Sequence, residues 1–311
     1  MSGDPTRIAV IDVGTNTTRL LVADVREGEI AEIERHSRVT RLGRGVDLSG
    51  KLSSEGIEAV CETVARYTAR YQELGAERVR AIATSAVRDA ANGEAFVAEL
   101  RERFALSPQV LEGTEEARLT YTGATWGRPP GPSTLVVDIG GGSTELIVGT
   151  GGEISFATSL QIGVVRQTER HIVSDPPTAA ELDALAGNVE GVIGEALSDH
   201  PEAQAIAAIG VAGTSTQLAA MDLGLDPYDP ARVHGHVLSL AAIQRMLARL
   251  STVPLAERRR IVGLDPDRAP TIVAGVVILI EVLRAFELEE VTVSEHDLLY
   301  GAAIEAGRTR G

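Results

Sequence analysis

The segment VIDVGTNTTRLLV, residues 10–22, recurs without a gap as VVDIGGGSTELIV, residues 136–148. Each copy contains an apolar run that ends in Asp, a turn rich in glycine and hydroxyl residues, and a second apolar run. This pattern predicts a strand, a tight turn and a second strand in each half of the chain. A gapless repeat of this kind predicts two duplicated domains.

The segments that follow each copy predict alternating strands and helices. In the first half a helix is expected from the capping residue Ser53, and residues 78–83 are expected to form a strand. The second half repeats this order loosely and adds two segments with helical apolar spacing. Its expected elements are a helix over 178–197, a strand over 205–211, a helix opened by residues 213–215, and the additional segments 236–250 and 268–288.

A segment rich in proline and glycine, residues 127–132, lies just before the second copy and cannot continue a helix. It predicts an N-terminal domain over 1–126 and a C-terminal domain over 127–311, whose last helix could pack back on the first domain. Mixed strands and helices in this order predict three-layer α/β domains with a ligand cleft between them. Both Asp-Gly turns are expected to face that cleft.

The charge balance limits the possible partners. The chain has 29 basic and 44 acidic residues, a net charge of −15, so its surface repels polyanions and nucleic acid is not an expected partner. A phosphate-rich substrate must therefore be held by local features such as backbone amides, a few arginines and a divalent cation. With no apolar run of about 18 residues and no secretory pattern, a soluble cytoplasmic protein without membrane contact is expected.

The two turns suit phosphate binding because glycines let several backbone N–H groups converge and the hydroxyl groups add donors. The acidic residues beside the turns suit a hydrated Mg²⁺ or Mn²⁺. A single copy could equally be an ordinary hairpin capped by its aspartate, but two matching copies favour the phosphate interpretation. The candidate metal ligands are Asp12, Asp138 and Glu145, and the candidate phosphate-binding residues are Gly14, Thr15, Asn16, Thr17, Arg19, Gly141, Gly142, Ser143 and Thr144.

Two further motifs supply candidate catalytic residues. ATSAVRDA, residues 83–90, follows a strand and starts a helix, and its Arg88 could clamp phosphate or simply pair with Asp89. In LEGTEEARL, residues 111–119, Glu115 and Glu116 could cap a helix, or one of them could act as a general base. Spacing alone leaves the choice between the two glutamates open.

These motifs together resemble the exopolyphosphatase and guanosine pentaphosphate phosphohydrolase family, within the actin-like ATPase (ribonuclease-H-like) superfold. The resemblance covers nearly the whole chain and includes DIGGGSTEL (138–146), GTEEARL (113–119) and AGT (212–214). It implies release of terminal orthophosphate from inorganic polyphosphate, with Glu116 as the base and a metal near Asp138 and Glu145. Arg88, both turns and the loop of Gly213 and Thr214 would bind phosphate, and a homodimer is expected by analogy.

The chain departs from the family pattern in two places. It lacks the extra C-terminal helical region of larger members, which favours short polyphosphates and leaves guanosine pentaphosphate hydrolysis, or tetraphosphate binding, as an alternative. Residues 294–301, SEHDLLYG, replace a more usual Gly-Leu-Arg-Glu-Gly pattern, and they are expected to open the last helix rather than to hold a metal.

Two other functions share the superfold. An ATP-dependent kinase would use similar phosphate loops, but its Gly-Gly adenosine loop is replaced here by Gly213-Thr214, and it would need an acceptor. A non-enzymatic alarmone sensor or regulator is disfavoured by the acidic balance and by the few residues that precede Ile8.

Overall fold

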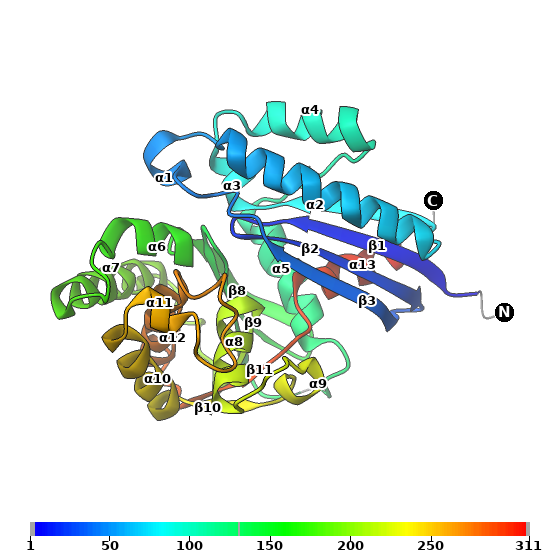
Figure 1. Cartoon of the computed structure of the whole chain (residues 1–311). Helices are drawn as coiled ribbons and strands as arrows, with labels where there is room; N and C mark the ends of the chain where they lie inside the picture. The colour runs from blue at the N-terminus through cyan, green and yellow to red at the C-terminus, as the bar shows by residue number, and fades with distance from the viewer. Residues whose placement is uncertain (1–3, 130, 309–311) are drawn as a thin grey trace. The chain divides into compact units, whose positions relative to one another are not determined.

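The computed structural model describes residues 4–129 and 131–308, so Pro130 of the predicted linker lies outside the described residues. The chain separates into two compact units (Figure 1). Unit 1 comprises Met1–Trp126 and His296–Gly311, and unit 2 comprises Gly127–Glu295. The last helix therefore belongs to unit 1, although unit 2 separates it in sequence from the rest of that unit.

Unit 1 is built on a five-stranded sheet of order β3-β2-β1-β4-β5. The first three strands are antiparallel neighbours, whereas β4 and β5 continue the sheet in parallel. Its strands are β1 (Thr6–Val13), β2 (Thr17–Arg26), β3 (Glu29–Val39), β4 (Arg78–Ala83) and β5 (Gln109–Val110), and its helices are α1 (Val46–Ser49), α2 (Ser54–Glu73), α3 (Ser85–Asp89), α4 (Gly93–Phe104), α5 (Gly113–Thr125) and α13 (Leu298–Arg308).

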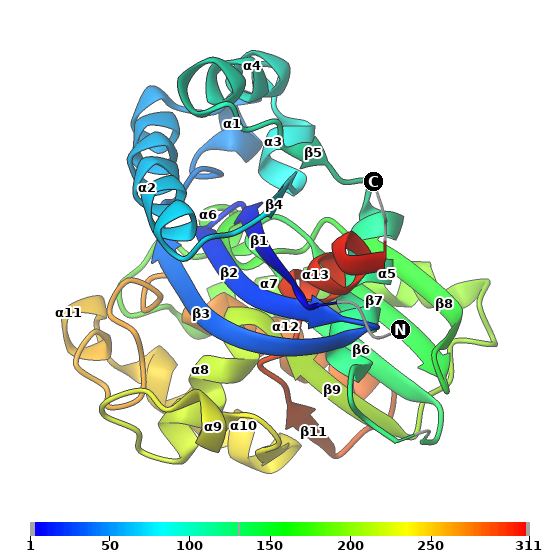
Figure 2. The same ribbon diagram turned by 90° about the vertical axis from the view of Figure 1, so that its right-hand side faces the viewer.

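Alternation along β1 gives unit 1 its three layers, because successive side chains of a strand point to opposite faces. Ala9 and Ile11 pack with residues of α2, whereas Ile8 and Val10 pack with residues of α5 and α13. Figure 2 shows α13 beside α5 on that second face. Unit 1 therefore has one helical layer on each side of its sheet.

Unit 2 repeats this topology in the order β10-β11-β9-β6-β7-β8. Strands β8, β7, β6, β9 and β11 correspond to the five strands of unit 1, and β10 adds an antiparallel edge. Its strands are β6 (Thr134–Ile139), β7 (Thr144–Thr150), β8 (Glu153–Leu160), β9 (Ala207–Val211), β10 (Val237–Ser239) and β11 (Glu290–Val293), and its helices are α6 (Val164–His171), α7 (Ala179–Ser198), α8 (Ala212–Asp222), α9 (Pro230–Val233), α10 (Leu240–Thr252), α11 (Leu255–Arg258) and α12 (Ile272–Ala285).

The fold class predicted from the repeat is confirmed: both units are α/β, and both have the ribonuclease-H-like strand order. The predicted strand over 78–83 has the observed bounds of β4, and the Ser53 side chain caps α2 by accepting from Gly56 N. One expectation needs correction. The segment 236–250 is not helical throughout, because Val237–Ser239 pairs with β11 as strand β10 before the helix begins.

Within the described residues, no helix is both long and apolar enough to cross a membrane. The most apolar helix, α12, is buried in the core of unit 2, where its side chains pack among residues of the sheet and of α7 and α10.

Candidate functional site

The second turn, between β6 and β7, presents a row of free backbone amides. The carbonyl oxygens of Gly140, Gly141 and Gly142 accept from Val164 N (2.9 Å), Val165 N (2.8 Å) and Gly163 N (3.1 Å), respectively. A trans peptide holds its C=O and N–H on opposite sides, so the amides of Gly141, Gly142 and Ser143 point away from α6. In the described chain these three amides donate to no other residue. Convergent amides of this kind form an anion-binding concavity.

Two hydroxyl side chains at this turn are predicted to bind phosphate, and only one of them is already hydrogen-bonded within the described part of the protein. The Thr144 hydroxyl is buried and donates to Ile162 O (2.8 Å), so it stabilises the hairpin. Ser143 is also buried, but its hydroxyl bonds to none of the residues that the structure describes. Of the two, Ser143 remains the candidate phosphate donor.

The first turn, between β1 and β2, is held in a similar way by the segment after β3. Thr15 O accepts from Gly43 N (2.7 Å), and Asn16 O accepts from Thr40 N and Arg41 N (both 3.0 Å). The amides of Thr15 and Asn16 donate to none of the described carbonyls. The Thr15 hydroxyl instead joins this turn to the start of α3, since it contacts Ser85 Oγ (2.8 Å) and accepts from Ala86 N (3.1 Å).

Arg19, predicted to bind phosphate, lies in a buried ion-pair cluster. Its guanidinium donates to Asp12 Oδ2 through Nε at 2.8 Å and through Nη2 at 2.7 Å, and it also pairs with Asp297. Burial raises the pKa of the Asp12 carboxyl above its usual range, although Arg19 acts in the opposite direction. Asp12 Oδ1 has no hydrogen-bond partner among the described residues. With Oδ2 engaged by Arg19, Asp12 offers a cation at most one free oxygen.

The sequence could not reveal the role of Asp297. Its Oδ1 accepts from Leu299 N (3.0 Å) at the start of α13, which agrees with the prediction that residues 294–301 open the last helix. The same carboxylate also pairs with Arg19, 278 residues away in sequence. No local signal marks a contact of that separation.

Arg88 and Glu116 lie together in unit 1. Arg88 Nη1 donates to Leu111 O (2.6 Å) and lies 3.5 Å from Glu116 Oε2, while its Nε is 3.7 Å from Asp89. The Glu116 side chain is 8% exposed and the Arg88 side chain 16% exposed. Glu116 is in the first turn of α5, at the positive end of the helix dipole. A carboxylate beside a cation at the edge of the core suits both proton transfer and anion binding.

The two glutamates that the sequence could not separate differ clearly in environment. Glu115 accepts two hydrogen bonds from Arg118, at 2.9 and 2.8 Å. The hydrogen bond from Arg118 lowers the pKa of Glu115, which makes it a weaker base. Glu116 is instead buried next to Arg88.

Asp138 and Glu145 lie directly opposite each other on β6 and β7. Both are nearly inaccessible, at 5% and 1% exposed, and Glu145 Oε1 accepts from Ser159 Oγ (2.7 Å). Two buried carboxylates with hard oxygen donors fit a Mg²⁺ or Mn²⁺ ion that also keeps waters and substrate phosphate as ligands. No group of three or more His, Cys, Asp or Glu residues in the described ranges forms a complete metal cage.

The loop of Gly213 and Thr214 opens α8, as predicted, but its surroundings include an arginine that the sequence analysis missed. A Cβ atom on Gly213 would lie 1.6 Å from Arg268 Nη1, so this residue must be glycine for the guanidinium to lie over the helix start. Thr214 is buried against Gly275 of α12. A glycine followed by a helix N-terminus was the available signal, but it does not identify which arginine approaches.

Comparisons with known proteins agree over nearly the whole chain. The sequence model of the Ppx/GppA phosphatase family matches residues 21–305. Exopolyphosphatase 2 of Mycobacterium tuberculosis is 36% identical over 313 residues, which cover 96% of this chain and 98% of that protein. A guanosine-5'-triphosphate,3'-diphosphate pyrophosphatase of Photobacterium profundum is 29% identical over 96% of this chain and 58% of its own length. The crystal structure of an exopolyphosphatase-like protein superposes with a TM-score of 0.93 at 35% identity, covering 98% of this chain and 99% of that one.

Proposed function

Because the chain belongs to the Ppx/GppA phosphatase family, we propose that it is an exopolyphosphatase that releases terminal orthophosphate from inorganic polyphosphate, preferentially from short chains. The observation that carries the proposal is the pairing of buried Glu116 with Arg88, in a protein similar to exopolyphosphatases along its whole length. This pair joins a base to a phosphate-binding cation.

In the proposed reaction Glu116 accepts a proton from the attacking water. The water oxygen forms a bond to the terminal phosphorus, and the bond from that phosphorus to the bridging oxygen breaks. The bridging oxygen leaves with its electron pair on a chain that is one phosphate shorter, and the products are orthophosphate and a proton. Proton transfer by a positioned carboxylate contributes about 10²- to 10⁴-fold in rate.

Arg88 and the backbone amides hold the negative charge of the substrate in this proposal. The Arg88 guanidinium carries Nη1–H and Nη2–H groups suited to phosphate oxygens, and its bond to Leu111 O fixes its direction. The free amides of Gly141, Gly142 and Ser143, together with those of Thr15 and Asn16, are the further phosphate donors. Such local donors allow a chain with a net charge of −15 to bind a polyanion.

Enzymes of this family generally need a divalent metal ion. We assign its protein ligands to Asp138 and Glu145, which are paired residues on the neighbouring strands β6 and β7. When bound, the ion would neutralise phosphate charge and polarise the phosphorus–oxygen bond. Ser159 positions Glu145 by donating to it. Asp12 is a weaker candidate because Arg19 occupies one of its oxygens.

The test is a comparison of neighbouring carboxylates. Glu116→Gln should lower orthophosphate release from polyphosphate by about 10²-fold or more, while the matched control Glu115→Gln should stay within about threefold of the wild type. Arg88→Ala should lower both affinity and rate. Equal turnover in Glu116→Gln and Glu115→Gln would remove Glu116 as the base.

The assay needs no acceptor, which excludes a kinase, and it compares polyphosphates of defined length with guanosine pentaphosphate. The similarity to a guanosine pentaphosphate pyrophosphatase makes that nucleotide the alternative substrate. Faster hydrolysis of the nucleotide than of every polyphosphate would replace the proposed substrate and leave the roles of Glu116 and Arg88 unchanged. Excess EDTA should abolish the activity, and full activity in EDTA would contradict the metal site. A homodimer is proposed by analogy alone.

A further inference from the structure

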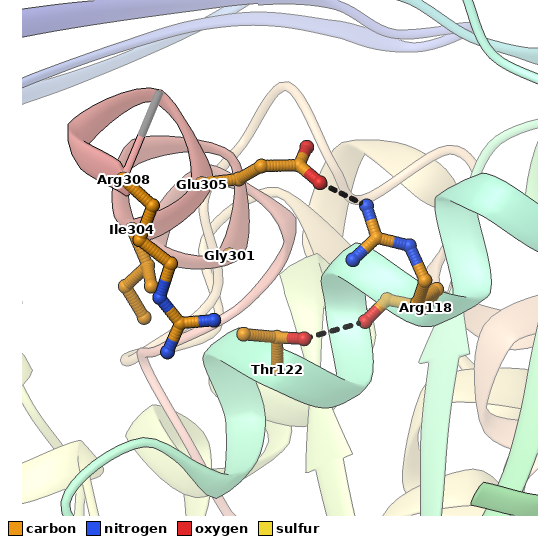
Figure 3. Close-up of a pocket in the computed structure, with 6 residues that line it drawn as sticks. All are labelled: Arg118, Thr122, Gly301, Ile304, Glu305 and Arg308. Atoms are coloured by element: carbon orange, nitrogen blue, oxygen red, sulfur yellow. Dashed lines mark hydrogen bonds and ion pairs between the residues drawn. The ribbon is translucent and has the colours of Figure 1, made fainter. Parts of the chain in front are cut away.

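A cavity of about 270 Å³ lies between α5 and α13 in unit 1, on side chains that the proposed reaction does not use. One of its lining residues, Gly301, is also a point where the two helices touch. Gly123 and Gly301 bring the backbones together, since a Cβ atom on either would lie 1.9 Å from a carbonyl oxygen of the other helix or its start. Figure 3 shows the cavity and its lining residues, which are Arg118, Thr122, Gly301, Ile304, Glu305 and Arg308.

The charges around this cavity do not cancel. Both oxygens of Glu305 are engaged, Oε1 by Arg118 and Oε2 by Arg80 (2.5 Å). Glu115 is also engaged by Arg118. Arg308 has no hydrogen bond or ion pair with any residue in the described part of the chain. Of the residues that line the cavity, two are arginines and one is a glutamate, in a protein whose net charge is −15.

The free arginine is directed across the cavity. In Figure 3 the Arg308 side chain extends from α13 toward Thr122 of α5, and its Nη2 also comes within about 4 Å of the Cβ position of Gly28. The Thr122 hydroxyl donates to Arg118 O (2.9 Å), so its oxygen can still accept. A ligand in the cavity would therefore meet one unpaired guanidinium, a second guanidinium that is already paired, and a hydroxyl group.

The cavity has room for a small ligand. Its volume of about 270 Å³ lies just below the roughly 300 to 1,000 Å³ of pockets for drug-sized ligands. An arginine that lacks a carboxylate partner is matched best by a planar or tetrahedral oxyanion, which can accept two parallel hydrogen bonds.

We propose that this cavity binds a small multivalent oxyanion such as orthophosphate, with Arg308 as its principal ligand and Arg118 as the opposite wall. The bound ion joins the C-terminal end of α13 to the middle of α5, where Arg118 and Thr122 lie. It is a second site, separate from the one that contains Arg88 and Glu116, because Arg118 lies on a side of α5 that faces α13 and solvent, whereas Glu116 is buried.

The test measures orthophosphate binding by isothermal titration calorimetry at constant ionic strength. The wild type is expected to bind orthophosphate at two sites, the proposed catalytic site and the cavity. Arg308→Ala should lose binding at the cavity and keep it at the catalytic site. Arg88→Ala should lose binding at the catalytic site and keep it at the cavity. Arg308→Lys should weaken the second site about tenfold, because a lysine keeps the charge but cannot make the two parallel bonds.

Arg66→Ala, which removes an exposed arginine on α2, is the matched control and should leave both sites intact. Arg308 is exposed in the last turn of its helix, so its replacement by Ala should leave the melting temperature within about 1 °C. An isotherm in Arg308→Ala identical to that of the wild type overturns the second site. Loss of all binding in Arg88→Ala would do so as well, and it would leave the proposed catalytic function untouched.

Discussion

The two hairpins of the repeat have the same strand pairing, but the charges of their paired side chains differ. In unit 1 Asp12 lies across from Arg19, and in unit 2 Asp138 lies across from Glu145, at the same register. The first pair is an ion pair, and the second brings two carboxylates together. A single position, Arg19 in one copy and Glu145 in the other, therefore decides whether the aspartate of the hairpin faces a cationic or an anionic side chain.

This difference separates two kinds of chemistry on one scaffold. The carbonyls of both turns are held by a later segment, which contains Gly43 in unit 1 and Gly163 in unit 2, so both turns present amides outward. The backbone thus presents free amides in both units, whereas the proposed cation site lies in unit 2 alone. Four experiments test how far the two units differ.

The largest expected effect is on turnover. It follows from removing one of the two acidic side chains of the second hairpin, which leaves it with a single acid, as in the first hairpin. Glu145→Gln should lower metal-dependent turnover by about 10³-fold, roughly 4 kcal/mol of transition-state stabilisation, because one of the two proposed metal ligands is lost. The measurement is kcat against Mg²⁺ concentration. Glu153→Gln, at the exposed start of β8, is the control and should match the wild type. Unchanged metal dependence in Glu145→Gln would contradict a cation site at the second hairpin.

The next effect is on stability and belongs to the first hairpin. Arg19→Ala leaves Asp12 and Asp297 buried without their cation, with side chains only 3% and 6% exposed. The free energy of unfolding, measured in urea at neutral pH, should fall by about 3 kcal/mol. The loss should shrink as the pH falls, since the pKa of Asp12 is raised and protonation relieves the unpaired charge. A pH-independent loss would show that packing, rather than charge, is responsible.

Replacing each of the two glycines that lie against the turns should lower the stability of the protein by a different amount. A Cβ atom on Gly163 would lie 2.4 Å from backbone atoms of Gly141 and Gly142, whereas one on Gly43 would meet chiefly the Thr15 methyl group at 2.2 Å. Because backbone yields less than a side chain, Gly163→Ala should cost about 2 to 3 kcal/mol and Gly43→Ala about 1. Gly191→Ala on α7, with nothing within 4 Å, should stabilise slightly. Equal costs at the first two positions would contradict this ranking.

The smallest effect concerns the long helix of each unit. The neutral Ser53 caps α2, whereas α7 begins with a capping box in which Glu181 accepts from Thr178 N (2.7 Å). Backbone hydrogen bonds lower the pKa of Glu181 to about 2, so its contribution is complete above pH 4.5 and is lost as the pH falls toward 2. Acid unfolding should therefore be less steep in Glu181→Gln than in the wild type over that range. The exposed Glu190→Gln on the same helix should follow the wild type.

Local sequence predicted the elements whose signals are local. The repeated hairpins, the strand over 78–83 and the cap at Ser53 rest on alternation, turn residues and hydroxyl side chains within a few positions. Strand β10 was missed, because Val237 and Leu238 fit helical spacing and become a strand only through pairing with β11. Pairing between segments so far apart leaves no mark on either segment alone.

The residues of the candidate site also fall into two groups, those that local sequence identifies and those that only the folded structure reveals. The glycine turns and the Arg88 and Glu116 motifs could be found from residue type and spacing. The difference between Glu115 and Glu116 could not, because it depends on Arg118 reaching one of them and on the burial of the other. Likewise Asp297 and Arg268 contact Arg19 and Gly213 across long stretches of chain, so only the folded structure reveals them.

The division of unit 1 into two stretches of chain has a consequence for biosynthesis. The ribosome completes unit 2, which is continuous in sequence, before it makes α13. Until then Ile8, Val10 and Leu119 lack the helix that covers them in the mature protein. The half of the protein that is made first therefore lacks one of the two helices that cover this apolar face until translation is almost complete.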